Sequence, residues 1–286
     1  MTRLPLVVLG AHGQVGREVM DLCLRQDRAA RFYDRATCDV ANVAALHAAI
    51  AESSCVINCA AYTAVDKAES ETAEAHRING EAPGLIAQVC CIHAVPLLHL
   101  STDYVFDGSG SRPWREEDPI APQNVYGRSK AEGEARIRAV LPQHIILRTS
   151  WVFGAHGQNF VKTMRRLAAT RPEISVVSDQ RGGPTPAAAI AAALATIADT
   201  VAARDDLYGT YHFAGAPAVS WYEFAKVILA SLQGVRIVPI DSAHYPTPAK
   251  RPLNAVLDCH KVHAAFGIEQ PDWRTALAAF PDASPV

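Results

Sequence analysis

Leu6-Val7-Val8-Leu9-Gly10-Ala11-His12-Gly13-Gln14-Val15-Gly16 is the stretch that decides the fold. Its unbroken apolar run, residues 6–9, is typical of a strand that is covered on both faces, as in a parallel sheet. Three glycines at a spacing of three residues follow, and then a helical pattern begins. A strand, a glycine turn and a helix in this order place a helix N-terminus where a pyrophosphate can bind. The stretch therefore predicts a dinucleotide-binding unit rather than a plain turn between a strand and a helix.

The second predicted strand, residues 31–33, ends at Asp34-Arg35. A carboxylate at this point can accept hydrogen bonds from the adenosine ribose hydroxyls, whereas an adjacent arginine favours a 2′-phosphate. Because both residues are present, the sequence does not choose between NADH and NADPH. Asp39-Val40 follows and could flank the adenine, although Asp39 could equally cap the next helix.

Further apolar runs alternate with helical patterns along the chain. Strands are predicted at residues 55–58, 96–100, 144–148, 174–177 and 208–213, and helices at 66–92, 126–141 and 187–201. This alternation predicts an α/β fold with a Rossmann-like, doubly wound parallel sheet and a smaller, interwoven α/β substrate-binding lobe. Residues 1–150, with about 179–215, are assigned to the dinucleotide-binding domain. Residues of about 151–178 and 216–286 are assigned to the second lobe.

Composition excludes several classes of function. The 286 residues are 49% hydrophobic and carry a net charge of -2, so nothing favours nucleic acid or an anionic membrane as a partner. No apolar run approaches the roughly 20 residues of a membrane span, and the N-terminus lacks signal-peptide architecture, so we expect a cytoplasmic protein. The seven cysteines include no Cys-x-x-Cys and are expected to pack as small hydrophobic residues. The eleven histidines show no metal-ligand spacing, and no metal is predicted.

Tyr126 and Lys130 are the candidate catalytic pair. They lie four residues apart at the start of a predicted helix and therefore on one face of it. The ammonium favours the phenolate by charge and makes the phenol a better proton donor than free tyrosine, whose pKa is about 10. Thr102, at the end of the fourth predicted strand, is the candidate second donor, because the carboxyl ends of such strands face the ligand crevice. Alone, each of these residues is as well explained by an exposed helix face or a strand end.

Several motifs together resemble a known family. The glycine triplet, the segment 101–108 and Tyr126-x-x-x-Lys130 resemble the extended short-chain dehydrogenase/reductases. Four narrower segments are similar to the dTDP-4-dehydrorhamnose reductases, and this resemblance covers nearly the whole chain. These segments are 59–69, Arg148-Thr149-Ser150-Trp151-Val152-Phe153-Gly154, Asp179-Gln180 with Gly183-Pro184-Thr185, and Arg251-Pro252 with Asn254 and Leu257-Asp258.

The resemblance implies reduction, by NADPH or NADH, of the 4-keto group of dTDP-4-dehydro-L-rhamnose to give dTDP-L-rhamnose. It implies Tyr126 as the general acid, Lys130 as the anchor of the nicotinamide ribose, and Thr102 as the residue that holds the carbonyl. The expected cofactor contacts are Gly10, Ala11, His12, Gly13, Gln14, Val15, Gly16, Asp34, Arg35, Asp39, Val40, Ala60, Ala61, Tyr62, Tyr126 and Lys130. The expected substrate contacts are Thr63, Val65, Thr102, Asp103, Tyr104 and Trp151, with Arg251 as a candidate cation for the diphosphate.

Alternatives stay open beside this interpretation. Some family members dimerise through a magnesium ion held by glutamates, but this chain reads Ala187-Ala188-Ala189 near that position, so the metal is not carried over and a homodimer stays open. A reductase or epimerase of a related nucleotide-linked keto-deoxysugar is one alternative. A dehydratase is disfavoured, because Thr102-Asp103-Tyr104 lacks the Asp-Glu pair of those enzymes. A non-catalytic regulatory homologue is disfavoured by the intact Thr102, Tyr126 and Lys130.

Overall fold

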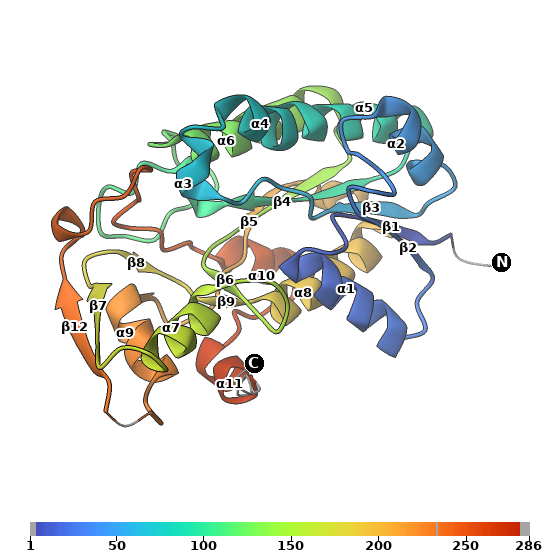
Figure 1. Ribbon diagram of the computed structural model, residues 1–286. Helices are drawn as coiled ribbons and strands as arrows, with labels where there is room; N and C mark the ends of the chain where they lie inside the picture. Colours follow the sequence, from blue (N-terminus) through green and yellow to red (C-terminus); the bar gives the residue numbers. More distant parts are fainter. Residues whose placement is uncertain (1–3, 233, 281–286) are drawn as a thin grey trace.

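A six-stranded, fully parallel sheet forms the centre of the computed structural model, which describes residues 4–232 and 234–280 (Figure 1). The strand order is β2-β1-β3-β4-β5-β10. The bounds are β1 Leu6–Leu9, β2 Ala30–Tyr33, β3 Cys55–Asn58, β4 Leu97–Thr102, β5 His144–Thr149 and β10 Gly209–His212. The order reverses beside β1, whose neighbours are β2 and β3. In such sheets the ligand crevice opens at the carboxyl ends of the strands at this reversal.

Helices cover both faces of this sheet, which confirms the predicted doubly wound α/β fold (Figure 1). Every residue of β1 and of β3 is buried, because each strand is packed on both sides. One face carries α2 (Val43–Ile50), α5 (Ala82–His93) and α6 (Val125–Val140). The other face carries α1 (Gln14–Arg25), α8 (Ala187–Val201) and α10 (His260–Phe266).

A smaller unit lies beside the carboxyl ends of the central strands (Figure 1). It pairs β7 (Glu173–Val177) in parallel with β12 (Arg236–Ile240) and adds α7 (Phe160–Ala168), α9 (Trp221–Ile228) and α11 (Trp273–Ala278). Its hydrophobic core is separate from the two beside the large sheet and includes the fully buried Phe224 and Trp273. Short pairs, β6 (Val152–Phe153) with β9 (Thr185–Pro186) and β8 (Arg181–Gly182) with β11 (Val219–Ser220), occupy the connections.

The prediction of one long helix at residues 66–92 is wrong, because the helical region is interrupted. The chain forms α3 (Val65–Ala68), α4 (Thr72–His76), a π-helical segment η1 (Arg77–Glu81) and only then α5. A π-helical turn adds a residue to the turn and so redirects the side chains that it carries. Here the buried Asn79 accepts from Tyr62 N at 2.8 Å and donates to Tyr62 O at 2.9 Å, which holds the segment after β3 in place.

Two further local expectations change. Asn42, not Asp39, caps α2, since the Asn42 side chain accepts from Ala45 N at 3.1 Å while Asp39 accepts from Ala41 N. Cys91 is exposed, so it does not pack as a small hydrophobic residue, whereas Cys59 is half-buried and the other five cysteines are buried. Within the described ranges, every helix is too short or too polar to pass through a bilayer.

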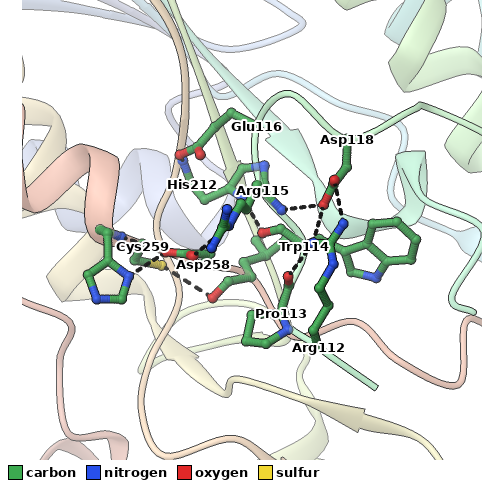
Figure 2. Close-up of polar contacts among 11 residues, drawn as sticks. Arg112, Pro113, Trp114, Arg115, Glu116, Asp118, His212, Asp258 and Cys259 are labelled. Carbon is green, nitrogen blue, oxygen red and sulfur yellow. Dashed lines mark hydrogen bonds and ion pairs between the residues drawn. The ribbon is translucent and has the colours of Figure 1, made fainter. Parts of the chain in front are cut away.

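The long connection between β4 and α6 is held by contacts with distant segments (Figure 2). After the short helix η2 (Asp103–Val105), Trp114 O lies 3.0 Å from His212 Nδ1, and Glu116 accepts from His212 N at 2.9 Å. Arg115 lies 3.5 Å from Asp258. These contacts tie the connection to β10 and to the segment before α10, and so fix the approach to α6.

Candidate active site

A cavity of about 290 Å³ opens at the carboxyl ends of β1 and β3, where the strand order reverses. It brings together most of the residues that were predicted to contact a dinucleotide. It also includes four residues that the sequence analysis missed, namely Cys38, Cys59, Glu74 and Ile78. The predicted residues that line it are Gly10, His12, Gly13, Asp34, Arg35, Asp39, Val40, Ala60, Ala61 and Tyr62.

The glycine turn forms one wall of this cavity, and Gly10 lets its backbone approach the neighbouring loop closely. Gly10 has a φ of +75°, and a Cβ there would lie 2.5 Å from Ala60 N, so only glycine lets the turn after β1 touch the loop after β3. Ala11, Val15 and Gly16 are buried beneath the turn rather than in the cavity wall. The Gln14 side chain instead accepts from Asn159 Nδ2 at 3.1 Å.

Asp34 and Arg35 both line the cavity, at the end of β2. Hydrogen bonds from the side chain and backbone of Thr37 lower the pKa of Asp34, which keeps this carboxylate ionised and able to accept from a ribose. Its Oδ2 lies 3.0 Å from His12 Nδ1. Arg35 is exposed and lies 3.7 Å from Glu74, so its guanidinium can also meet a phosphate. The site accommodates either form of the cofactor.

Thr102 and Tyr126 come from separate segments that the fold brings together. Thr102 ends β4, and Tyr126 is the second residue of α6. The Tyr126 ring packs edge-on against Tyr104, with centroids 5.6 Å apart. Gly127 permits this approach, since a Cβ there would lie 2.2 Å from Tyr104 O. Asn124 caps the helix by accepting from Gly127 N at 2.7 Å.

The electrostatic relation between Tyr126 and Lys130 differs from the prediction. Burial raises the pKa of Tyr126 to about 12; hydrogen bonding with the Thr102 side chain lowers it, and the charge of Asp103 raises it further. The Lys130 ammonium is directed at β4 instead, where Nζ donates to Leu100 O at 2.6 Å and lies 3.3 Å from His99 Nε2. Burial lowers the pKa of Lys130 to about 8.

His99 and Asn58 are residues of this site that the sequence analysis missed. Asn58 Nδ2 lies 3.0 Å from His99 Nδ1, and Asn58 Oδ1 accepts from Ala60 N at 3.0 Å. Burial lowers the pKa of His99 well below its usual value, so the imidazole stays neutral. The two residues connect Lys130 to the loop that lines the dinucleotide cavity. The available signal was a polar residue in each of two largely apolar strands, Asn58 at the end of β3 and His99 within β4.

A second cavity, of about 510 Å³, belongs to the smaller unit. Its lining includes Phe160, Arg171, Trp221, Tyr245 and Arg251. Arg251 is not a free cation, however, because its two terminal nitrogens bond the carboxylate of Asp66 at 2.9 and 2.8 Å. The distance of this partner in the sequence, 185 residues, hides the pair from local analysis.

The remaining predicted substrate residues lie in the segments that follow β3, β4 and β5. Trp151 has a φ of +46° and stacks on Trp221, with ring centroids 3.5 Å apart. The charges of Asp103 and Arg251 both act on the pKa of Tyr104, which burial raises, so this tyrosine lies near both groups. Thr63 lies just before α3 and is exposed. Val65 begins α3 and is half-buried, and it precedes the Asp66 that pairs with Arg251.

A separate cluster of possible metal ligands lies outside these cavities. The ligand atoms of Glu18, Asp21 and His156 lie within 4.8 Å of one another, and His156 Nε2 is 3.0 Å from Asp21. Sequence spacing missed this group because α1 supplies two members and the segment after β6 the third.

Comparisons with known proteins identify the family of this chain. The family model described as RmlD substrate binding domain matches residues 4–284. A dTDP-4-dehydrorhamnose reductase of Aggregatibacter actinomycetemcomitans is 44% identical over 95% of this chain and 96% of its own. A probable dTDP-4,6-dihydroxy-2-methyloxan-3-one 4-ketoreductase of Streptomyces antibioticus is 38% identical over 96% of this chain and 94% of its own. The structure of dTDP-4-dehydrorhamnose reductase from Bacillus anthracis in complex with NADP is 33% identical, with a TM-score of 0.91 over 98% of this chain and 99% of that one. This chain therefore belongs to the RmlD substrate binding domain family and, as its resemblance implied, to the family of the dTDP-4-dehydrorhamnose reductases.

Proposed function

We propose that this chain reduces the 4-keto group of dTDP-4-dehydro-L-rhamnose to give dTDP-L-rhamnose, with NADPH or NADH as the reductant. The observation that carries the proposal is the convergence of Thr102 and Tyr126, from β4 and α6, beside the cavity built by the glycine turn. Family membership supplies the class of substrate.

The lining of the cavity suits a dinucleotide. The turn at Gly10 presents backbone without a side chain, next to the N-terminus of α1, where a pyrophosphate is stabilised. Asp34 and Arg35 are proposed to meet the adenosine ribose, and Asp39 and Val40 the adenine. A bound reduced nicotinamide supplies the hydride that adds to the keto carbon.

The protein handles the proton and the developing charge. Tyr126 is proposed to give its phenolic proton to the alkoxide that forms, and Thr102 to hold the same oxygen by a hydrogen bond. Lys130 is proposed to anchor the nicotinamide ribose from the position that Leu100 and His99 give it. Because burial raises the pKa of Tyr126 to about 12, the phenol carries its proton at neutral pH.

The second cavity is proposed to hold the nucleotide end of the sugar substrate. Its aromatic side chains, Phe160 and Trp221, suit stacking on a base, and Arg171 supplies positive charge. Thr63, Val65, Asp103, Tyr104 and Trp151 are proposed to contact the sugar between the two cavities. The substrate lobe, about 151–178 and 216–286, stays a proposal, and α10 within that range packs against the central sheet instead.

Tyr126→Phe tests the assignment. Loss of a positioned proton donor typically costs about 10²–10⁴-fold, so kcat should fall at least a hundredfold, or about 3 kcal/mol. The measurement is the loss of NADPH absorbance on addition of the keto-sugar nucleotide. Fluorescence titration should show nearly unchanged NADPH binding. Tyr222→Phe, on α9, is the matched control and should keep full activity. Near-normal turnover by Tyr126→Phe would remove Tyr126 from this role.

Reduction of a related nucleotide-linked keto-deoxysugar is the second candidate, because a 38% identical relative carries the name of such a ketoreductase. Comparing kcat/KM for several dTDP-linked keto sugars, each with NADPH and with NADH, separates the candidates. We further propose that the enzyme is cytoplasmic and that it forms a homodimer. Light scattering on the purified protein would test the homodimer.

A further inference from the structure

Asp103 is a carboxylic acid buried at the centre of this site. Its side chain is 2% exposed and directly follows Thr102 in the chain. One carboxyl oxygen, Oδ1, lies 2.8 Å from Thr102 Oγ1. The other, Oδ2, is buried and has no hydrogen-bond partner among the described residues. An ionised carboxylate left with an unsolvated oxygen is strongly disfavoured, whereas a neutral acid is tolerated.

The hydroxyl of Thr102 can donate only one proton. It can also accept two hydrogen bonds, and Tyr104 N already donates to it at 3.2 Å. If Asp103 is ionised, it can only accept, so the single Thr102 proton is committed to Asp103 Oδ1. If Asp103 is neutral, it can donate to Thr102 Oγ1 and fill the second acceptor position. The Thr102 proton is then free to point at Tyr126 or at a substrate oxygen.

We propose that Asp103 works as a neutral acid, a positioning residue that donates to Thr102 and thereby aims the threonine proton at the reacting oxygen. This inference rests on the proposed reductase function. It assigns Asp103 a hydrogen-bond-donating role toward the protein itself, beyond contact with the sugar. It also defines which protonation state of the site is active.

The surroundings of Asp103 support the neutral form. Burial, the largest cause, raises the pKa of Asp103 to about 7, while hydrogen bonds from Thr102 and the local backbone lower it only in part. The titratable groups around it are Tyr104 on η2 and Tyr126 on α6, with Asp66 and Arg251 acting on Tyr104 from beyond. The Asp66–Arg251 pair is mutually neutralised. Ionised Asp103 would also raise the pKa of Tyr126 by its charge and so weaken the proton donor.

The sign of the pH dependence follows. A carboxyl whose pKa is raised is neutral below that pKa and ionised above it, so activity should fall as pH rises through about 7. Lys130, whose pKa is lowered to about 8, would contribute a separate change at higher pH. Replacing Asp103 should remove the fall in activity near pH 7 and leave the change at higher pH that is due to Lys130.

Asp103→Asn is the decisive variant, because its amide can donate to Thr102 at every pH. We expect kcat at pH 6 within about tenfold of wild type, and no fall near pH 7 in a profile from pH 5.5 to 9. Asp103→Leu, which cannot donate, should lose about a hundredfold in kcat, and the same loss is expected for Thr102→Val. Adding Asp103→Asn to Thr102→Val should change nothing further, because the positioned hydroxyl is already gone. Asp107→Asn, at a half-buried carboxylate nearby, is the matched control and should keep the wild-type profile.

Two results would overturn the inference. One is an Asp103→Asn variant as inactive as Thr102→Val although it still binds NADPH, since the carboxylate would then be needed ionised. The other is an unchanged fall near pH 7 in Asp103→Asn. Failure of the proposed function looks different, because the wild-type protein would then not oxidise NADPH with the keto sugar at any pH.

Discussion

Gly10 controls the dinucleotide cavity by the side chain that it lacks. Its positive φ and its approach to the Ala60 backbone join the turn after β1 to the loop after β3. Gly13 lies in the same turn but is less constrained, because a Cβ there would meet only Gly10 O, at 3.3 Å. Two glycines of one motif therefore differ in how well they tolerate a side chain, and the spacing of the motif does not reveal this difference.

Gly10→Ala should weaken NADPH binding at least tenfold, equivalent to about 1.4 kcal/mol. The added methyl group must push the turn away from Ala60 and also places alanine in a left-handed conformation. Fluorescence titration with NADPH measures the effect. Gly13→Ala is the matched control and should bind severalfold more tightly than Gly10→Ala. Equal NADPH affinities for the two variants would contradict the inference that a side chain is tolerated less well at Gly10 than at Gly13.

Helix α6 carries Tyr126 and Lys130, two of the proposed catalytic residues, and is anchored at several points. Tyr126, Lys130 and Glu134 lie four residues apart on one face. The fully buried Glu134 accepts from Arg148 on β5 at 2.7 and 2.9 Å and from Ser101 on β4 at 2.6 Å. At the start of the helix, Asn124 caps the first turn and also donates to Lys250 O at 2.8 Å. The position of the Tyr126 phenol therefore depends both on the contacts of Glu134 and on the cap by Asn124.

Asn124→Ala should destabilise the protein by about 0.5–2 kcal/mol and also lower kcat, because the first turn of α6 holds Tyr126. Urea denaturation gives the stability, and NADPH oxidation gives the rate. Asn42→Ala removes the equivalent cap of α2, away from the catalytic cluster, and should cost similar stability with kcat unchanged. If both variants keep full kcat, the cap of α6 does not position the tyrosine.

At the scale of the whole molecule, the central sheet and the smaller unit meet through aromatic stacking. Trp151 leaves β5, and Trp221 begins α9 of the smaller unit. Their rings are nearly parallel, with an interplanar angle of 8°. Gly182 allows this packing, since a Cβ there would lie 2.6 Å from Trp151 Cε2. The stack joins the catalytic edge of the sheet to the second cavity, which Trp221 lines.

Trp221→Ala should raise the KM for the sugar nucleotide about tenfold while leaving the affinity for NADPH unchanged. An aromatic pair contributes roughly 0.5–1.5 kcal/mol beyond its buried area, and Trp151 would lose its support. Initial-rate kinetics with varied sugar nucleotide, together with NADPH titration, check this outcome. Tyr222→Ala, the next residue on α9, is the control. A large loss of NADPH affinity would show that the two cavities are not separable in this way.

The sequence by itself determined the features that depend on neighbours along the chain. The strand at residues 6–9, the glycine turn and start of a helix after it, and the bounds of α8 were all predictable from local pattern. Strand periodicity and glycine conformation act within a few residues, so these elements can be derived without tertiary contacts. The pairing of Tyr126 with Lys130 on one helical face belongs to the same class.

Only the tertiary structure decided the protonation and pairing of the site. Lys130 bonds β4 rather than acting on the phenol, and Arg251 is neutralised by Asp66. Asp103 Oδ2 is buried without a hydrogen-bond partner in the part of the chain that the structure describes. A pKa depends on desolvation and on charges that arrive from distant segments, and neither quantity is encoded in residue spacing. The candidate catalytic groups could therefore be named from the sequence and stay a proposal, whereas their pKa values depend on how deeply the fold buries them.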